Sequence, residues 1–398
     1  MTDRPPLVVL ATRIYAPEAA AATFRLRALV RSLGDRARVR VLTTTPPPAL
    51  RGRGSGPTGE VTVSRWPVLR DRTGYVRGYL PYLSFDLPLA LRLLIGPRAD
   101  VAVVEPPPTT GAVTRVALGL RSLLSPRRRT PYVYYAADVW SDATASMGAP
   151  QPVVRLMRAV EAFALRGARD VVAVSDGVAD RVRALAGPDA PVSVVPNGVD
   201  TAVFTPDGDV HPEAPGTAYL VYAGTASEWQ GAEVFAEAMR EVVREAPGAR
   251  LVFLGQGSSW RALERIAADL PGGAVELRPL VPPEEAAAWL RGAAAALVSV
   301  RPGVGYDFAY PTKVVAALAC GTPVVFAGPG PAAQDVREHR LGAAVEYDVQ
   351  PVAAAMTEAL RAGPDPAEAG RRVRWVHEHR SLAATGEAAA RVVLRARP

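Results

Sequence analysis

Residues 101–140 read VAVVEPPPTTGAVTRVALGLRSLLSPRRRTPYVYYAADVW and hold a strand, a helix and a second strand in succession. Val101–Glu105 is a short apolar run that three prolines end, and Tyr132–Trp140 is a second apolar run. The segment Ala112–Leu124 between them is predicted to be a helix. Because apolar runs without polar alternation are typical of strands buried on both faces, this unit predicts two parallel strands joined by a right-handed crossover.

The same alternation extends on both sides of this unit. In Thr23–Leu33 the apolar residues recur near helical spacing, and Val153–Arg166 is predicted to be a further helix. The additional strands predicted here are Leu7–Thr12, Val39–Thr45, Val61–Val68 and Val171–Ser175. Repeated strand–helix alternation predicts a doubly wound α/β domain over residues 1–203.

The pattern starts again at about residue 217. The strands predicted there are Tyr219–Ala223, Leu251–Leu254, Val275–Leu280, Ala296–Val300, Pro323–Phe326 and Ala343–Tyr347, with helices such as Ala232–Ala246 and Ser259–Leu270 between them. Residues 204–216 are rich in Pro, Gly and Asp, which indicates a linker. We therefore predict an α/β protein with two Rossmann-like doubly wound domains, 1–203 and 217–364, that face a cleft, followed by a helical tail over 365–398.

Composition narrows the class of protein. A length of 398 residues is typical of two domains, and 49% hydrophobic residues exclude a disordered chain. The single cysteine, Cys320, excludes a disulfide framework and a cysteine-based zinc cluster. The net charge is +7, yet of the 46 Lys and Arg residues only Lys313 is a lysine. An arginine-rich bias replaces exposed lysines easily, so a lysine that persists indicates a position that needs a compact ammonium, unless it persists by chance.

Nothing in the sequence predicts secretion or a membrane-spanning helix. The N-terminus, MTDRPPLVVLAT, has an acidic residue and a short apolar run, unlike a signal peptide. The apolar window Tyr79–Gly96 is interrupted by Asp86, Arg92 and two prolines. The positive charge is spread widely and no nucleic-acid-binding module is present, so we expect no nucleic-acid partner. The expected location is cytoplasmic.

Several loop motifs, weak singly but strong in their order, resemble those of one enzyme family. They comprise Ile14–Glu18, Val101–Pro108, Asp138–Asp142, Val174–Gly177, Pro196–Asp200, Ala223–Gly231, Leu254–Gly257 and Pro311–Val325. Over roughly residues 7–350 the chain resembles the retaining GT-B glycosyltransferases of family 4, and more narrowly the bacterial branch that builds surface or secondary-metabolite glycans.

This resemblance implies a first domain that binds the acceptor, a second that binds a nucleotide-diphospho-sugar, and a tail that crosses back to the first domain. It implies retention of configuration, with the leaving phosphate taking the acceptor proton, so that the protein mainly positions and stabilises charge. No cofactor is required and no metal-binding carboxylate pair is present. A nucleotide-sugar epimerase on the same fold and a non-catalytic glycosyltransferase-like subunit are the alternatives.

Lys313 is the first candidate for donor binding and catalysis. It follows Pro311-Thr312 at the start of the apolar, helix-compatible run Val314–Ala319. The first turn of a helix offers unpaired N–H groups and the positive end of the dipole, which bind anions. Lys313 adds an ammonium at the same place, and this combination suits a nucleotide diphosphate. The alternative is a surface lysine on a loop.

The remaining donor-side candidates are, by resemblance, Gly224, Thr225, Gln230, Gly255, Gly257, Arg301, Gly305, Asp307 and Thr312. Thr225 and Gln230 are neutral where many relatives have Arg and Lys, so Lys313 should matter more. Phe308 and Ala316 occupy the positions of two glutamates that in relatives contact the sugar and the ribose. This departure leaves the identity of the donor open, and Asp307 is the nearest substitute.

The acceptor-side candidates follow strands of the first domain. They are Tyr15, Glu18, Glu105, Asp138, Trp140 and Asp142, with Asp138 and Glu18 as the catalytic candidates beside Lys313. For the two aspartates, a turn or a helix cap is the alternative. All four histidines lie after residue 203, so a histidine base on the acceptor side is not expected.

The segment 70–95 decides between two kinds of acceptor. It combines aromatic and leucine residues with Arg70, Arg72, Arg77 and Arg92. Such composition suits a peripheral contact with the inner membrane face and a polyprenyl-linked acceptor. A core helix under the sheet, with a small-molecule acceptor, is the alternative.

Overall fold

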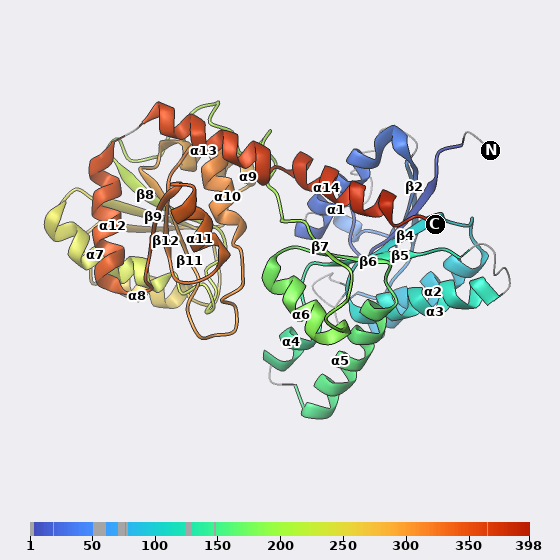
Figure 1. Cartoon of the computed structure of the whole chain (residues 1–398). Coiled ribbons are helices and arrows are strands. Elements are labelled where there is room, and N and C mark those ends of the chain that lie inside the picture. Colours follow the sequence, from blue (N-terminus) through green and yellow to red (C-terminus); the bar gives the residue numbers. More distant parts are fainter. Residues whose placement is uncertain are drawn as a thin grey trace. The chain divides into compact units, whose positions relative to one another are not determined.

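The computed structural model describes residues 4–18, 20–50, 61–70, 76, 79–123, 129–146, 149–363 and 365–398. The chain divides into two compact units, Met1–Asn197 with Leu382–Pro398, and Gly198–Ser381 (Figure 1). Each unit is an α/β layer structure built on a parallel sheet. The prediction of two Rossmann-like doubly wound units is therefore confirmed.

The first unit contains a seven-stranded parallel sheet in the order β3-β2-β1-β4-β5-β6-β7. Its strands are β1 Leu7–Ala11, β2 Arg38–Thr44, β3 Val61–Trp66, β4 Val101–Val104, β5 Tyr132–Ala136, β6 Asp170–Ala173 and β7 Val192–Val194. β1 pairs with β2 on one side, Val8 opposite Val39, and with β4 on the other, Val8 opposite Val101. The strand order thus reverses between β1 and β4, which is where ligands bind in open α/β sheets.

Helices cover both faces of this sheet. They are α1 Ala21–Leu33, α2 Tyr79–Ile95, α3 Pro108–Leu123, α4 Trp140–Ser146, α5 Gln151–Arg166, α6 Asp176–Ala186 and α14 Leu382–Arg395. Because side chains alternate along a strand, Val8 and Leu10 pack with α1 and α14 in one core, where these two helices lie side by side (Figure 1). On the opposite face, Tyr134 contacts Gly111 of α3.

The second unit repeats the plan with six parallel strands in the order β10-β9-β8-β11-β12-β13. The strands are β8 Tyr219–Ala223, β9 Arg250–Leu254, β10 Val275–Arg278, β11 Ala295–Ser299, β12 Val324–Ala327 and β13 Gly342–Val345. The helices are α7 Glu233–Glu245, α8 Trp260–Ala268, α9 Pro283–Gly292, α10 Thr312–Ala319, α11 Pro331–Glu338, α12 Val349–Ala362 and α13 Pro366–His379. Here the strand order reverses between β8 and β11.

Some local boundaries differ from the expectation. The strand expected over Tyr132–Trp140 ends at Ala136, and Trp140 instead begins α4. Residues 204–216, expected as a linker, lie within the second unit, where His211 stacks on Trp289 at 4.5 Å between ring centroids. Of the tail, α13 belongs to the second unit and α14 to the first. No helix among the described residues is long and apolar enough to cross a membrane.

Candidate functional site

A cavity of about 510 Å³ opens in the second unit where β8 and β11 end and α10 begins. The described residues that line it are Val199, Phe204, Ala223, Gly224, Thr225, Ser227, Trp229, Gln230, Leu254, Leu280, Val281, Pro283, Ala286, Leu290, Ala296, Leu297, Val298, Thr312, Lys313 and Ala316. Of these, Lys313 alone carries a charge. The cavity lies at the reversal of strand order, and its volume suits a small-molecule ligand.

Lys313 is the second residue of α10. Its Nζ donates to the Thr225 carbonyl oxygen at 2.7 Å and lies 5.0 Å from the centroid of the Tyr222 ring. Because these neighbours carry no full negative charge, desolvation is uncompensated and lowers the pKa of the Lys313 ammonium to about 7. An anion in the cavity would restore the protonated form.

The start of α10 adds a second attraction for an anion. Within the described chain no side chain caps this helix, since its N-cap residue is Pro311. The Val314 N–H donates to the Pro311 carbonyl at 3.1 Å. The N–H groups of Thr312 and Lys313, which have no acceptor within the helix, and the helix dipole are the attractions for a ligand. Thr312, the first helical residue, is exposed and lines the cavity.

Gly224 allows Lys313 to lie against the loop that follows β8. Its φ is +120°, which disfavours other residues, and a Cβ added there would lie 2.9 Å from Lys313 Cε. The Gly224 N–H donates to the Leu254 carbonyl at 2.7 Å, which fixes the loop on β9. The structure therefore brings together Gly224, Thr225 and Lys313, three of the donor-side candidates from the sequence.

Gln230, which stands where many relatives have a lysine, hydrogen-bonds within the same loop. Its side chain is buried, and Oε1 accepts hydrogen bonds from the Ser227 N–H and hydroxyl, both at 3.1 Å. The Tyr222 hydroxyl lies at 3.5 Å from the same oxygen. Gln230 lines the cavity and holds its rim, so Lys313 supplies the positive charge among the described lining residues.

Gly255 and Gly257 pack against the loop that contains Gly224 and Ala226 and are absent from the described lining of the cavity. A Cβ at Gly255 would collide with the Gly224 carbonyl, and one at Gly257 with the Ala226 carbonyl. The Ala226 N–H in turn donates to the Gln256 carbonyl at 2.8 Å. These glycines therefore permit close approach of two loops.

Three other donor candidates also lie outside the described lining. Arg301 is exposed, and its backbone N–H donates to the Trp229 carbonyl at 2.8 Å. Gly305 has a φ of +83°, and the Asp307 carboxylate accepts the Gly303 N–H at 3.2 Å, so both shape the loop before α10. Of the glutamate positions, Ala316 lines the cavity and Phe308 does not.

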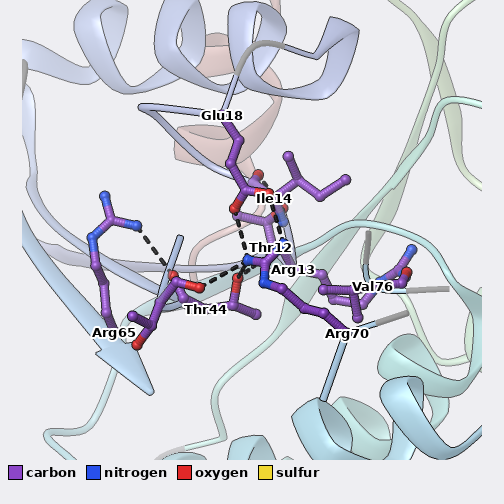
Figure 2. A network of polar contacts seen from close by, with 9 residues as sticks. Thr12, Arg13, Ile14, Glu18, Thr44, Arg65, Arg70 and Val76 are labelled. Carbon is purple, nitrogen blue, oxygen red and sulfur yellow. Dashed lines mark hydrogen bonds and ion pairs between the residues drawn. The ribbon is translucent and has the colours of Figure 1, made fainter. Parts of the chain in front are cut away.

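In the first unit, a polar network gathers at the carboxyl ends of β1, β2 and β3 (Figure 2). Glu18 accepts two hydrogen bonds from the Arg70 guanidinium, at 2.9 and 3.0 Å, and both side chains are largely buried. Arg70 also donates to the Thr44 hydroxyl at 3.1 Å and the Thr45 carbonyl at 2.8 Å. A bidentate pair of this kind fixes the loop after β1.

Two further arginines in this network donate to backbone carbonyls. Arg65 donates to the carbonyls of Thr44 and Ala16. Arg13 donates to the Val76 carbonyl at 3.0 Å, and its guanidinium lies 4.4 Å from the Tyr82 ring centroid. Burial lowers the pKa of both guanidinium groups. Sequence reasoning missed these two residues, although Arg13 directly precedes a motif that it singled out.

Glu105 and Asp138 occupy different environments. Glu105 is buried, pairs with Arg25 and accepts a hydrogen bond from the Thr12 hydroxyl at 3.1 Å. Its carboxylate therefore has protein partners inside the first unit. The Asp138 side chain reaches the surface. Desolvation by nearby protein atoms nevertheless raises the pKa of its carboxyl, and the Arg25 charge opposes that shift. Of the two, Asp138 is the one that a ligand can reach.

The remaining acceptor candidates are held by protein partners. Asp142 accepts two hydrogen bonds from Arg181, both at 2.6 Å. The Trp140 ring meets Tyr82 edge-on at 5.8 Å, and its backbone N–H donates to Glu161 at 2.9 Å. Tyr15 is buried, which raises the pKa of its hydroxyl. Neither Glu161 nor Arg181 was expected from sequence.

No group of three or more His, Cys, Asp or Glu side chains that could hold a metal ion occurs in the described part of the chain. Of the segment 70–95, Arg72, Tyr75 and Arg77 lie outside the described residues, as does the side chain of Tyr79.

Comparisons with known proteins agree with this architecture. Residues 22–203 match the model described as Glycosyltransferase Family 4, and residues 217–362 match the one described as Glycosyl transferases group 1. The second match lies within the second unit, and the first covers most of the first unit and extends six residues beyond Asn197.

Two curated relatives are D-inositol 3-phosphate glycosyltransferases. That of Pseudarthrobacter chlorophenolicus is 32% identical over 166 residues, covering 39% of this chain and 38% of the relative. That of Segniliparus rotundus is 30% identical over 229 residues, covering 52% and 48%. The chain thus matches less than half the length of either relative.

Solved structures show the same fold at low identity. The Anabaena protein HepE in complex with UDP has a TM-score of 0.70 and 15% identity, over 98% of this chain and 100% of that one. WaaG, a glycosyltransferase involved in lipopolysaccharide biosynthesis, has a TM-score of 0.65 and 16% identity, over 97% and 99%.

Proposed function

The chain belongs to family 4 of the GT-B glycosyltransferases, and from that premise we propose that it transfers a sugar from a nucleoside-diphosphate sugar to an acceptor with retention of configuration. The observation that carries the proposal is Lys313, a desolvated ammonium in a cavity whose other described lining residues are uncharged. HepE, with the same fold, is solved with UDP and with UDP-glucose, which supports a nucleotide-sugar donor.

The donor diphosphate is assigned to the start of α10. There the helix N–H groups and the Lys313 ammonium converge, and Gly224 gives the phosphates close access to backbone. The apolar part of the cavity suits the nucleoside. It is lined by Leu254, Leu280, Val281, Pro283, Ala286 and Leu290. We assign no cofactor and no metal to this chemistry, because a lysine and a helix terminus supply the positive charge.

The same two groups act in the transfer step. As the glycosidic bond to the diphosphate breaks, negative charge grows on the leaving phosphate, and Lys313 and the α10 N–H groups stabilise it. The leaving phosphate accepts the proton of the attacking hydroxyl on the same face, so no strong protein base is needed. Asp138 and the Glu18 loop then orient the acceptor.

The acceptor is assigned to the loop after β1 and carries a phosphate. Arg13, Arg65 and Arg70 surround this loop, and of the three Arg70 pairs with Glu18. Carboxylates face all three: Glu18 lies beside Arg65 and Arg70, and Asp86 and Glu105 lie beside Arg13. The anionic acceptor is therefore inferred from the curated relatives and from the guanidinium groups that an acceptor phosphate would meet here. The curated relatives, whose name specifies D-inositol 3-phosphate, support an acceptor of that chemistry.

The outer helices of the first unit favour a lipid-linked form of that acceptor. Large apolar side chains are exposed on neighbouring helices: Leu80, Leu83, Leu87, Leu91 and Ile95 on α2, Val116, Leu120 and Leu123 on α3, and Leu156 and Phe163 on α5. The two acidic residues of these three helices, Asp86 and Glu161, are 0% and 1% exposed, whereas Arg155, Arg158 and Arg166 are exposed. An apolar face with only positive exposed charges suits an anionic bilayer at the inner membrane face, and the product would then be a surface glycan.

Flotation with phosphatidylglycerol vesicles tests the membrane contact. The wild-type chain should float with the vesicles. The double variant Leu87→Glu/Leu91→Glu should stay at the bottom of the gradient. Val210→Glu, at an apolar position of the second unit that is about as exposed as Leu91, is the control for adding a surface charge and should float. A wild-type chain that does not float would assign the acceptor to the soluble class.

Nucleotide release tests the activity itself. The chain is incubated with UDP-, GDP- and dTDP-glucose, with and without phosphorylated acceptors, and the released nucleoside diphosphate is measured. We expect one donor to be consumed, and Lys313→Met to lower the rate by a factor of about a hundred or more. Absence of donor binding at millimolar concentration would overturn the proposed function.

A further inference from the structure

A second cavity, of about 490 Å³, opens in the first unit at the amino ends of β5 and β6. Its described wall is formed by α3, by the segments that lead into these two strands and by the residues that follow α14. The candidate acceptor network lies at the carboxyl ends of β1, β2 and β3 and shares no residue with this wall. The cavity therefore belongs to neither of the candidate sites described above.

Positive charge dominates this cavity. Its described lining holds no aspartate or glutamate and four arginines, which are Arg115, Arg129, Arg169 and Arg397. Pro398 also lines it, and even with the carboxylate of this last residue counted, the positive charges exceed the negative by three. The nearest carboxylate along the chain, Asp170, already accepts a hydrogen bond from the Ser193 hydroxyl at 3.2 Å and lies 3.7 Å from Arg395.

Three of the arginines are available to a ligand. Arg129 and Arg169 are exposed, and neither side chain makes a hydrogen bond or an ion pair with another described residue. Arg115 is held in place, because it donates to the Phe163 carbonyl and its guanidinium lies 4.1 Å from the centroid of the Phe163 ring. Gly167 permits this position, since a Cβ there would collide with the Arg115 side chain. The cavity thus combines one fixed guanidinium with two unpaired ones.

A smaller cavity adjoins this one, and Leu118 and Thr130 line both. Three more arginines, Arg40, Arg92 and Arg121, line the smaller cavity, again with no acidic side chain in the described wall. Arg92 is 8% exposed, and its burial together with the charge of Arg40 lowers its pKa to about 10. Buried positive charge that no carboxylate offsets adds to the positive potential of the open cavity.

A phosphate group suits this arrangement. The planar fork of a guanidinium matches phosphate oxygens and donates two hydrogen bonds to them at once. The volume is in the range of small-molecule pockets and exceeds what inorganic phosphate alone would fill. We propose that this cavity is a second anion site, which binds a phosphate ester through Arg115, Arg129 and Arg169. Such binding requires neither the donor nor sugar transfer and so goes beyond the proposed function.

The surface of α3 offers a place for a lipid that carries the phosphate. Two stripes of side chains run side by side along this helix at helical spacing. One lines the cavity and comprises Arg115, Leu118, Gly119 and Ser122. The other is apolar and exposed, and comprises Val116, Leu120 and Leu123. A phosphate bound at Arg115 would therefore leave attached acyl chains beside an apolar surface, whereas a free phosphate ester would use the cavity alone.

Two probes with the same phosphate separate these sources. Glycerol 3-phosphate is titrated by calorimetry, and phosphatidic acid is presented in phosphatidylcholine vesicles for flotation. Lys313→Met is the background throughout, so that the donor cavity contributes no cation. The site pair Arg129→Gln/Arg169→Gln should weaken binding at least tenfold, because charge-assisted hydrogen bonds are lost. The control pair Arg155→Gln/Arg158→Gln removes two exposed charges of α5 outside the cavity and should change binding much less.

The outcome in each assay assigns the source. Flotation that is lost in the site pair alone assigns a lipid phosphate, and loss of glycerol 3-phosphate binding with unchanged flotation assigns a free ester. Thermal melting should give the same Tm for both pairs and the background chain, since Arg129 and Arg169 have no described partners to lose. Binding of neither probe, or a site pair that behaves like the control pair in both assays, would overturn the inference and leave the proposed function standing.

Discussion

Donor affinity should depend on pH through Lys313. In the free protein the pKa of this ammonium is about 7, because burial is not offset by a negative partner. A bound diphosphate supplies two negative charges beside Nζ, which should raise the pKa of Lys313 above the pH range of the assay. Binding therefore takes up a proton whenever the pH exceeds about 7.

The size of the effect follows from linkage. The apparent Kd should rise by about thirtyfold between pH 6 and pH 8.5, approaching tenfold per pH unit above pH 7. At pH 8 about 0.9 proton should be taken up for each ligand bound, since about nine-tenths of the free protein then carries a neutral lysine. The sign is fixed, because the group is charged in the complex and neutral in the free protein at high pH.

Calorimetry measures both quantities with one ligand. A nucleoside-diphosphate sugar is used because its phosphates carry no proton that titrates in this range. Heats measured in phosphate and in Tris at the same pH give the protons taken up. Lys313→Arg keeps its charge at every pH and should show a nearly constant Kd. A wild-type Kd that is flat from pH 6 to 8.5, with equal heats in the two buffers, would refute the reasoning.

Three further substitutions test other parts of the structure. Gly224→Ala places a Cβ 2.9 Å from Lys313 Cε at a φ of +120°, so donor affinity should fall by about tenfold or more in calorimetry, and unchanged affinity would exclude this loop from the site. Arg70→Ala breaks the bidentate pair with Glu18 and should lower kcat/KM for the acceptor while the Kd of the donor stays constant; Arg36→Ala, which breaks an exposed pair, is the control and should change neither. Glu161→Ala removes a buried carboxylate that accepts two backbone N–H groups at the start of α4, and urea unfolding should show a loss of about 2–4 kcal/mol, with a loss below 1 kcal/mol arguing against this capping role.

Much of the fold is predictable from the sequence because buried parallel strands leave a strong pattern. The runs Tyr219–Ala223 and Leu251–Leu254 coincide closely with β8 and β9, since each is apolar throughout and the next segment is polar or contains glycine. The end of β5 is harder to predict. Val139 and Trp140 are apolar and follow the run after Asp138. The buried Glu161 of α5, however, accepts hydrogen bonds from the N–H groups of Trp140 and Ser141, and α4 begins at Trp140.

The candidate site also contains residues whose placement is predictable from the sequence and residues whose placement is not. Gly224, Thr225 and Lys313 are brought together as the motifs predict. Gly255 and Gly257 follow a strand like ligand-binding glycines, but their close contacts are with backbone carbonyls of a neighbouring loop, and one sequence does not separate these cases. Asp142 is likewise held by an arginine 39 residues away, a contact that depends on how α4 and α6 pack. Local pattern identifies where loops leave a sheet, and tertiary contacts decide which side chains remain available.

Because Lys313 is the only lysine of the sequence, its titration can be followed directly. Carbon-13 labelling of lysine gives one side-chain Cε signal, and its position against pH reports the charge of Lys313 with no assignment problem. With the free protein the midpoint should lie near pH 7, and with saturating nucleoside-diphosphate sugar it should move above pH 9. The same midpoint with and without the nucleotide sugar would contradict the claim that this ammonium holds the donor diphosphate.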